Sequence, residues 1–157
     1  MPSPKSAIQN LRLAERPRRL RRTAGLRRMA RETRLSTDNL VAPLFVTEGE
    51  AVQEEIPSMP LQYRYSIDYL VEEAAELYEL GIPAVALFPA IPEALKDPVA
   101  TAALDPAGLY PRAVEAIKEQ VPDLLVITDT ALDPYSSDGH DGVVRAGRVV
   151  NDETVEI

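Results

Sequence analysis

The sequence predicts an α/β fold in which short parallel strands alternate with helices. Three apolar runs begin near residues 41, 83 and 124, about forty residues apart. The two intervals between them each contain a segment whose apolar residues recur at helical spacing. This rhythm is typical of right-handed βαβ units in a parallel sheet. It does not separate a doubly wound sheet from an eight-stranded barrel, but both bind ligands at the carboxyl ends of their strands.

Each apolar run has the composition of a strand covered on both faces, because polar residues do not alternate with the apolar ones. The runs are LVAPLFV at 40–46, IPAVALF at 82–88 and LLVIT at 124–128. Pro43 removes one hydrogen-bond donor from the first strand. The segment 48–65 is polar and interrupted by prolines, so it is predicted to be a loop.

Two helices are predicted in the intervals between the strands. The first begins after Ser66, which is expected to be its N-cap, and ends at Gly81. The second covers 109–120, and its inward residues are expected to be Ala113, Val114 and Ile117. The segment before it, IPEALKDPVATAALDPAG, is predicted to be a loop.

The last residues, NDETVEI, are predicted to begin a further helix. Asn151 is a favourable N-cap, and Asp152 and Glu153 suit the first turn of a helix. A chain that ends where a helix opens is expected to be part of a longer one. Three strands cannot close a barrel, so exposed strand edges and apolar surface are expected, and these favour association.

Charge divides the chain into a basic arm at 1–35 and an acidic body at 36–157. The arm contains eleven basic and two acidic residues, a net charge of +9, whereas the body contains six basic and 23 acidic residues, a net charge of −17. The arm could dock on the acidic body of another copy, form a solvated tail or bind nucleic acid phosphates. It lacks aromatic residues for stacking on bases, so assembly is the favoured prediction and nucleic acid the least favoured.

The sequence contains no cysteine, so no disulfide framework points to an oxidising compartment. The beginning, MPSPKSAIQN, lacks the apolar core of a signal peptide, and no apolar run is long enough to span a bilayer. The default prediction is a soluble cytoplasmic protein without a membrane partner.

An aspartate-rich loop follows the third apolar run. Its sequence is TDTALDPYSSDGHDG, with carboxylates at Asp129, Asp133, Asp138 and Asp141 and the single histidine of the chain, His140. Carboxylate oxygens suit Mg²⁺ or Ca²⁺, although the spacing is not that of an EF-hand. Two interpretations stay open: the cluster orients a substrate amine or a weakly bound metal, or the aspartates form turns and caps. The histidine is expected to make hydrogen bonds within the loop.

Several motifs together resemble the δ-aminolevulinic acid dehydratases, also called porphobilinogen synthases. From about Arg16 to the last residue, they are RPRRLRRTAGLRRMARETRLS, LVAPLFVTEG, IPSMP, GIPAVALFP and VPDLLVITDTALDPYSSDGHDG. The resemblance implies a TIM-type (β/α)8 barrel with an extended N-terminal arm, of which this chain contains the arm and about three β/α units. It implies condensation of two 5-aminolevulinate molecules into porphobilinogen, a lyase reaction of heme biosynthesis. It also implies a homo-oligomer, usually an octamer, in which the arm embraces a neighbouring subunit.

The resemblance also assigns roles within the loop. Asp129 matches an active-site aspartate that faces the amino group of the substrate. In zinc-dependent members three cysteines bind the metal, at positions that match Ala131, Asp133 and Asp141 here, so no zinc is expected. The aspartate-rich form is associated with Mg²⁺ or with no active-site metal. Asp133 and Asp141, with water, are therefore the candidate metal ligands.

Catalysis in this family requires two Schiff-base lysines in the second half of the barrel. The lysines of this chain are Lys5, Lys96 and Lys118, and none occupies a matching position. The substrate-carboxylate arginines and the usual regulatory Mg²⁺ ligands of the family also have no match here. The chain is therefore expected to be a fragment of the enzyme that is inactive alone. The alternative is a non-catalytic assembly module that docks on full-length subunits through its basic arm.

Overall fold

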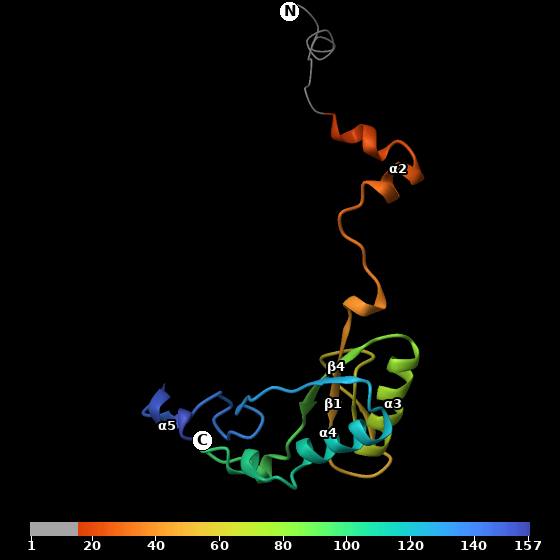
Figure 1. The fold of residues 1–157 in the computed structure, drawn as a ribbon. Coiled ribbons are helices and arrows are strands. Elements are labelled where there is room, and N and C mark those ends of the chain that lie inside the picture. The colour runs from red at the N-terminus through yellow and green to blue at the C-terminus, as the bar shows by residue number, and fades with distance from the viewer. Residues whose placement is uncertain (1–15) are drawn as a thin grey trace, which may run out of the picture. The chain divides into compact units, whose positions relative to one another are not determined.

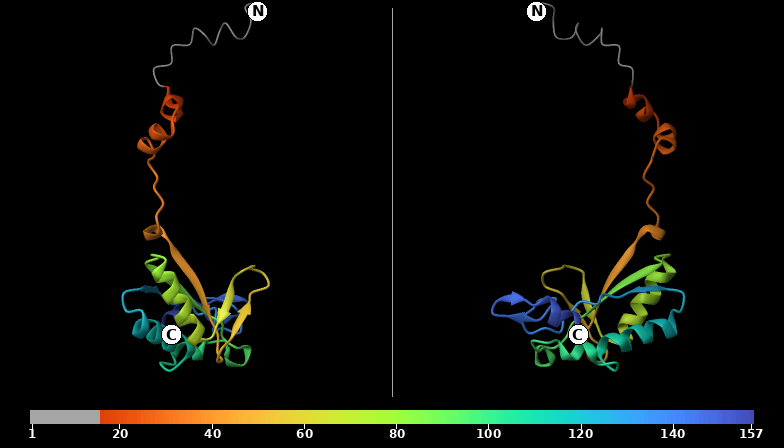
Figure 2. Two further views of the ribbon diagram at one scale, coloured as in Figure 1. Left: turned by 90° about the vertical axis from the view of Figure 1, so that its right-hand side faces the viewer. Right: turned by 60° about the vertical axis from the view of Figure 1, so that its left-hand side comes forward.

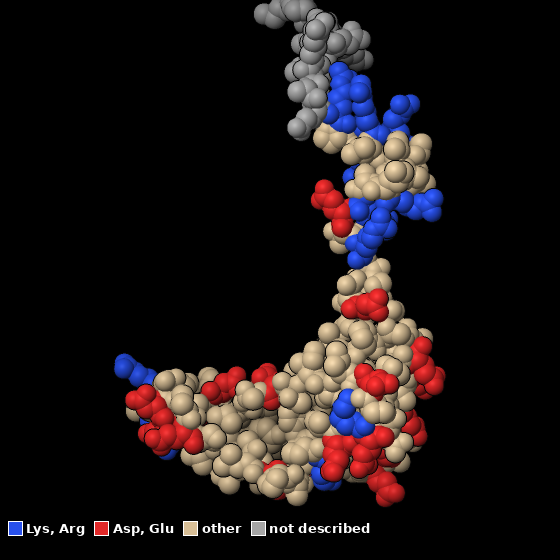
Figure 3. Space-filling model, in the orientation of Figure 1, with Lys and Arg blue, Asp and Glu red and all other residues tan. Residues whose placement is uncertain are grey.

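The computed structural model describes residues 16–157, and the chain divides into two compact units at Leu35 and Ser36. In the first unit a 3-10 helix, η1 (Pro17–Arg21), precedes α2 (Ala24–Met29). Thr23 caps α2 by accepting a hydrogen bond from the backbone N–H of Leu26 at 3.1 Å. All described residues of this unit are exposed, and Figure 3 shows basic side chains gathered over it.

The second unit is built on a five-stranded sheet in the order β2-β3-β1-β4-β5. The strands are β1 (Val41–Val46), β2 (Gln53–Glu55), β3 (Tyr63–Tyr65), β4 (Ala84–Pro89) and β5 (Leu125–Ile127). Strand β1 pairs in parallel with β3 and β4, and β4 pairs in parallel with β5. The predicted α/β pattern of parallel strands is confirmed (Figure 1).

The prediction of a loop at 48–65 was wrong, because this segment contains β2 and β3. The two strands pair antiparallel and form a hairpin at one edge of the sheet (Figure 2). Strand β3 joins β1 through the register Phe45↔Arg64. Both strands are only three residues long and are held by their neighbours, so no periodic pattern marks them in the sequence.

Two helices, α3 (Ile67–Glu79) and α4 (Leu109–Gln120), pack against each other and against one face of the sheet (Figure 1). The core between helices and sheet contains Leu44, Val46, Val85 and Leu87 from the strands and Leu70, Ala74, Ala113 and Ile117 from the helices. Ala113 and Ile117 therefore point inward as predicted, and Val114 is half-buried. Ser66 is the N-cap of α3 as predicted, but its hydroxyl makes no capping hydrogen bond and accepts from Val52 N at 2.8 Å.

The other face of the sheet is apolar and open to solvent in the described part of the chain. Its exposed side chains include Phe88, Leu125 and Ile127, and the rings of Phe45 and Phe88 stack with their centroids 5.6 Å apart. The prediction that the strands are covered on both faces was therefore wrong for this face. The exposed apolar surface expected from three strands is present.

A short 3-10 helix, η2 (Thr37–Asn39), precedes β1. Long connections follow the carboxyl ends of β4 and β5. The connection after β4 contains two further 3-10 helices, η3 (Glu93–Leu95) and η4 (Thr101–Leu104). After β5 the aspartate loop leads to a hairpin of β6 (Val144–Arg145) and β7 (Arg148–Val149) and then to α5 (Asn151–Val155). Between residues 16 and 157, no helix combines the length and the apolar character needed to cross a membrane.

The helix predicted near Asn151 is present, but Asn151 is its first helical residue and Val150 is the N-cap. The hydroxyl of Thr154 accepts from Val143 N at 3.0 Å and donates to Val150 O at 2.7 Å. This side chain therefore connects α5 to the end of the aspartate loop.

Candidate active site

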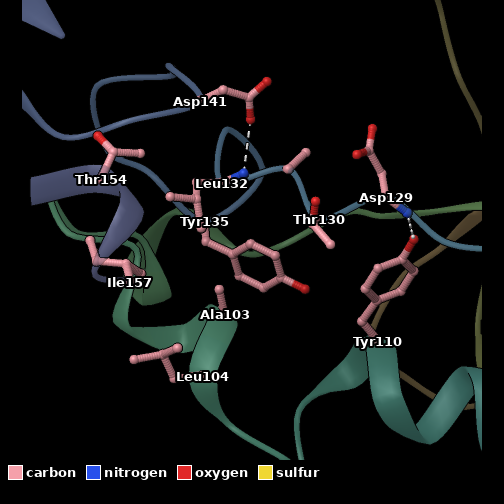
Figure 4. A pocket seen from close by; sticks show the side chains of 11 residues that line it. Ala103, Leu104, Tyr110, Asp129, Thr130, Leu132, Tyr135, Asp141, Thr154 and Ile157 are labelled. Carbon is pink, nitrogen blue, oxygen red and sulfur yellow. Dashed lines mark hydrogen bonds between the residues drawn. The ribbon is translucent and has the colours of Figure 1, made fainter. Parts of the chain in front are cut away.

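Two cavities lie at the edge of the sheet where the parallel strands end. The first, of about 570 Å³, is lined by Ala103, Leu104, Tyr110, Asp129, Thr130, Ala131, Leu132, Tyr135, Asp141, Thr154 and Ile157 (Figure 4). The second, of about 470 Å³, is lined by Phe45, Ile56, Met59, Arg64, Leu87, Phe88, Pro89, Ala90, Tyr110, Asp129, Ala131, Asp133, Pro134 and Tyr135. The cavities share Tyr110, Asp129, Ala131 and Tyr135, so Asp129 faces both.

Tyr110 connects the ends of two strands at this edge. Its hydroxyl donates a hydrogen bond to Leu87 O, in β4, at 2.6 Å. The same oxygen accepts from the backbone N–H of Asp129, just after β5, at 3.2 Å (Figure 4). Burial raises the pKa of Tyr110, and the negative charge of Asp129 acts in the same direction, so the phenol stays protonated and able to donate at neutral pH.

Asp129 is held by its backbone while its carboxylate stays accessible. The residue is exposed, and within residues 16–157 its side chain accepts no hydrogen bond. Figure 4 shows the carboxylate turned away from the ring of Tyr110. An exposed carboxylate at a cavity wall can accept hydrogen bonds from a ligand ammonium group.

Asp141 and Asp133 are brought together by a turn. One carboxylate oxygen of Asp141, Oδ1, accepts from Leu132 N at 2.8 Å and from Asp133 N at 3.1 Å. Burial raises the pKa of Asp133, and the negative charge of nearby Asp141 raises it further. The two carboxylates are therefore close enough to repel each other.

The carboxylate oxygens of Asp133 and Asp141 suit some metal ions and not others. Within residues 16–157, no three His, Cys, Asp or Glu side chains are grouped so that they could hold a metal. Asp133 and Asp141 provide two hard carboxylate groups, which fit a hydrated Mg²⁺ that keeps several of its waters. They do not fit zinc, because structural and catalytic zinc sites use three or four protein ligands, commonly sulfur or imidazole nitrogen.

Asp138 and His140 lie outside both cavities. The backbone N–H of Asp138 donates to the hydroxyl of Ser136 at 3.2 Å. His140 is exposed and borders a small separate space beside Pro98 and Val99. Of the residues predicted from the loop, the fold therefore brings Asp129, Asp133 and Asp141 to the cavities and leaves these two aside.

The loop after β4 holds the aspartate loop in place. Asp97 N donates to Tyr135 O at 3.2 Å, and Ser137 N donates to Asp97 O at 3.1 Å. The carboxylate of Asp97 accepts from Val99 N at 2.8 Å, which fixes the turn that presents these groups. Tyr135 is buried at the centre of this contact.

The described lysines take part in local structure. Lys96 forms an ion pair with Glu93. Lys118 donates to Leu124 O at 2.9 Å and also to Pro122 O, so it closes the turn after α4. Neither lysine lines either of the two cavities. Lys5 lies outside the described residues.

Tyr110 and Arg64 were not predicted from the sequence. Tyr110 lies on the inward stripe of α4, three residues before Ala113 and seven before Ile117, and this spacing was the available signal. Arg64 lies in β3, a strand that the sequence did not reveal, and no signal pointed to it.

Comparison with known proteins extends these observations. The family model for delta-aminolevulinic acid dehydratase matches residues 14–157. The delta-aminolevulinic acid dehydratase of Chlamydia pneumoniae is 44% identical over 150 residues, which cover 96% of this chain and 45% of the relative. That of Synechocystis sp. is 49% identical over 146 residues, 90% of this chain and 44% of the relative. The chloroplastic enzyme of Glycine max is 48% identical over 150 residues, 94% of this chain and 36% of the relative.

A crystal structure of delta-aminolevulinic acid dehydratase (porphobilinogen synthase) from Toxoplasma gondii, in complex with the reaction product porphobilinogen, has a similar fold. The TM-score is 0.88 at 44% identity, and the match covers 93% of this chain and 42% of that chain. The chain thus spans less than half of the length of each of these relatives. With a family model matched over 14–157, the chain belongs to the delta-aminolevulinic acid dehydratase family.

Proposed function

We propose that this chain is the N-terminal part of a porphobilinogen synthase, a TIM-type barrel enzyme that condenses two molecules of 5-aminolevulinate into porphobilinogen with loss of water. Family membership and the product bound in the Toxoplasma gondii relative support this reaction. The observation that carries the proposal is the accessible carboxylate of Asp129 at the wall shared by both cavities. In this position it can bind the ammonium group of a substrate.

The residues of this chain bind and orient the substrate. Tyr110 holds the backbone of Asp129 beside the end of β4, so the carboxylate is presented from a fixed position. Phe45, Phe88 and Leu87 form an apolar wall next to it. This wall lowers the local dielectric and strengthens the attraction between the carboxylate and an ammonium group.

The carbonyl chemistry of the reaction depends on Schiff-base lysines, and these have no match in this chain. Schiff-base formation requires a lysine with a lowered pKa at the substrate, and neither Lys96 nor Lys118 lines either of the two cavities. We propose that the chain alone is inactive and that the reaction belongs to the whole enzyme. Asp133 and Asp141 are the proposed ligands of a hydrated Mg²⁺, whose charge would offset their mutual repulsion.

A matched pair of variants tests the function. In the protein that contains this chain, Asp129→Asn should lower kcat/KM for 5-aminolevulinate by about tenfold to hundredfold, since a hydrogen bond to a charged group contributes about 1.5–3 kcal/mol. Asp138→Asn removes the same charge from the same loop outside the cavities, so its kcat/KM should match that of the wild type. Equal losses in the two variants would contradict the role of Asp129.

A second proposal is an assembly role for the arm at residues 1–35. Its described part exposes apolar side chains among the arginines, namely Leu20, Leu26, Met29 and Leu35. In a homo-oligomer these side chains would be buried on a neighbouring subunit, with the basic charge assisting only weakly because exposed ion pairs are screened by salt. Deleting 1–35 should lower the sedimentation coefficient and leave the circular dichroism of the second unit unchanged. Unchanged assembly, or salt-sensitive binding to DNA, would favour a solvated tail or a nucleic acid role.

The DNA that follows codon 157 separates the enzyme from the alternative, a non-catalytic assembly module. An open reading frame that continues into a lysine-bearing second half supports the enzyme, whereas a stop codon supports a non-catalytic module that docks on full-length subunits.

A further inference from the structure

A further cavity lies within the first unit of the chain, the arm. It has a volume of about 560 Å³ and is formed by residues of η1, of α2 and of the two positions that follow α2. Its lining is Pro17, Arg18, Leu20, Arg21, Arg27, Ala30 and Arg31. Four of these residues are arginines and none is acidic, so this arm cavity gathers four positive charges around one space.

The local structure of the arm places these arginines beside one another. Arg18 and Arg21 are three apart in η1, and residues three apart in a 3-10 helix lie on the same side of it. Arg27 lies in the last turn of α2, and Arg31 follows the C-cap of that helix. The guanidinium of Arg27 donates from Nη1 to Arg21 O at 2.9 Å, which connects α2 to η1 and orients this side chain in the cavity wall.

The arm provides little negative charge of its own. Residues 16–35 contain nine arginines and one acidic residue, Glu32, a net charge of +8. None of the ion pairs found between residues 16 and 157 involves an arginine of the arm. Figure 3 shows this concentration of basic side chains over the arm. Because the four like charges around the cavity repel one another, an anion bound between them would be attracted by all four.

The chemistry of the lining suits a compact phosphate anion. Guanidinium groups bind phosphate oxygens through paired, charge-assisted hydrogen bonds. Each group carries five N–H donors, so four arginines offer more donors than a monovalent anion can use. Residues 16–35 include no aromatic side chain that could stack on a base. Recognition therefore depends on the charge of the phosphates and not on a nucleoside.

We propose that the arm cavity binds a compact multivalent phosphate anion, of the pyrophosphate class, through the four arginines that line it. The anion bridges η1 and α2 and offsets the repulsion between their arginines. Leu26, Met29 and Leu35 lie outside the lining, so they stay available for contacts with a neighbouring subunit. The inference does not depend on the proposed reaction, because it uses no residue of the candidate active site.

Two pairs of adjacent arginines provide matched variants. In η1, Arg18 lines the cavity and Arg19 does not, and in α2, Arg27 lines it and Arg28 does not. Replacement of any of the four by glutamine removes one positive charge from the arm. Calorimetric titration of the full 157-residue chain with inorganic pyrophosphate, in metal-free buffer at about 0.15 M salt, measures the affinity.

The wild type should bind one pyrophosphate per chain. Arg18→Gln and Arg27→Gln should each weaken binding by about threefold to tenfold, because each removes a charge-assisted contact at an exposed site. Arg19→Gln and Arg28→Gln should weaken it by less than about twofold, because salt screens charges that do not touch the anion. Arg27→Gln also removes the bond to Arg21 O, so Arg18→Gln decides if circular dichroism shows that Arg27→Gln alters the arm.

Three results would overturn the inference. The first is the absence of pyrophosphate binding. The second is an equal loss in all four variants, which would show a diffuse attraction to the whole arm. The third is binding of a short DNA duplex that pyrophosphate does not displace, which would show that the arginines bind an extended phosphate backbone. The kcat/KM of Asp129→Asn tests the proposed function separately, so failure of one is distinguishable from failure of the other.

Discussion

Replacing Tyr110 by phenylalanine removes the hydroxyl that holds the start of the aspartate loop. The ring stays, but the bond to Leu87 O at 2.6 Å and the bond from Asp129 N at 3.2 Å are both lost. The first bond is partly buried and contributes about 1 kcal/mol. The second is exposed, and because water can replace it, it adds about 0.5 kcal/mol. The expected loss in the free energy of unfolding is therefore about 1–2 kcal/mol.

Thermal unfolding followed by circular dichroism measures this loss. In a domain of this size about 1 kcal/mol lowers the melting temperature by about 2–4 °C, so Tyr110→Phe should melt about 3–6 °C below the wild type. Tyr78→Phe is the control, because Tyr78 is 41% exposed on α3. Surface substitutions of this kind usually change stability by less than about 0.5 kcal/mol.

The amide of Asp129 provides a local measurement of the same contact. Its hydrogen exchange should become faster in Tyr110→Phe, because the amide loses its acceptor. Equal melting temperatures of Tyr110→Phe and Tyr78→Phe, together with unchanged exchange at Asp129, would refute the reasoning.

The stability of the protein at alkaline pH provides a second test of the contact made by the Tyr110 hydroxyl. Burial raises the pKa of Tyr110 above its ordinary value of 10.0, so the unfolded chain loses this proton first. The stability conferred by the protonated hydroxyl is fully present below pH 10.0 and is lost as the pH rises through the folded-state pKa. Tyr110→Phe should therefore lose less stability over this range than the wild type does.

Three further predictions concern charge, covalent chemistry and metal. The pKa of Asp133 lies above its ordinary value of 3.8. The stability that its protonated form gives the fold is therefore fully present below pH 3.8 and is lost as the pH rises. Asp133→Asn should melt above the wild type at pH 7, and this difference in melting temperature should disappear towards pH 3. A lower melting temperature at pH 7 would contradict this. Borohydride reduction with 5-aminolevulinate should leave no adduct on Lys96 or Lys118 by mass spectrometry; a stoichiometric, substrate-dependent adduct would overturn the proposal that the chain alone is inactive. Activity of the protein that contains this chain should survive a zinc-selective chelator, and a loss of activity rescued by zinc alone would contradict this prediction.

The elements predicted from the sequence are those whose own residues carry a strong pattern. The three apolar runs became β1, β4 and β5, and the helix predicted at 109–120 has the observed bounds of α4. Helix α3 also follows Ser66 and ends before Gly81, whose φ of 83° suits glycine. In these segments the apolar periodicity and the local propensity agree, so the sequence is sufficient to locate them.

The elements that were missed depend on their neighbours. Strands β6 and β7 are two residues long and meet at Ala146 and Gly147, which have φ of 49° and 75°. The strands β2 and β3 are similarly short, and β3 exists because it adds to the edge of β1. Such strands are stabilised by pairing in three dimensions, which leaves no period in the sequence.

The residues of the candidate site also differ in whether the sequence could predict them. Asp129 could be predicted because it directly follows a strand, and the carboxyl end of a parallel strand is a ligand-binding position in α/β folds. Tyr110 lies in α4, 19 residues before Asp129, and Arg64 enters from β3, a strand between β2 and β1 that had not been predicted. Spacing along the chain does not report such contacts.

The structure also relates the two interpretations of the aspartates that the sequence left open. Asp141 performs the capping role, because its Oδ1 accepts hydrogen bonds from the backbone N–H groups of Leu132 and Asp133. This capping brings its carboxylate close to that of Asp133, and the resulting repulsion contributes to the raised pKa of Asp133. Capping and metal binding are therefore compatible, since a carboxylate whose Oδ1 accepts from the backbone can still bind a metal ion through Oδ2. The turn that forms the loop is also what brings together the two carboxylates proposed to bind Mg²⁺.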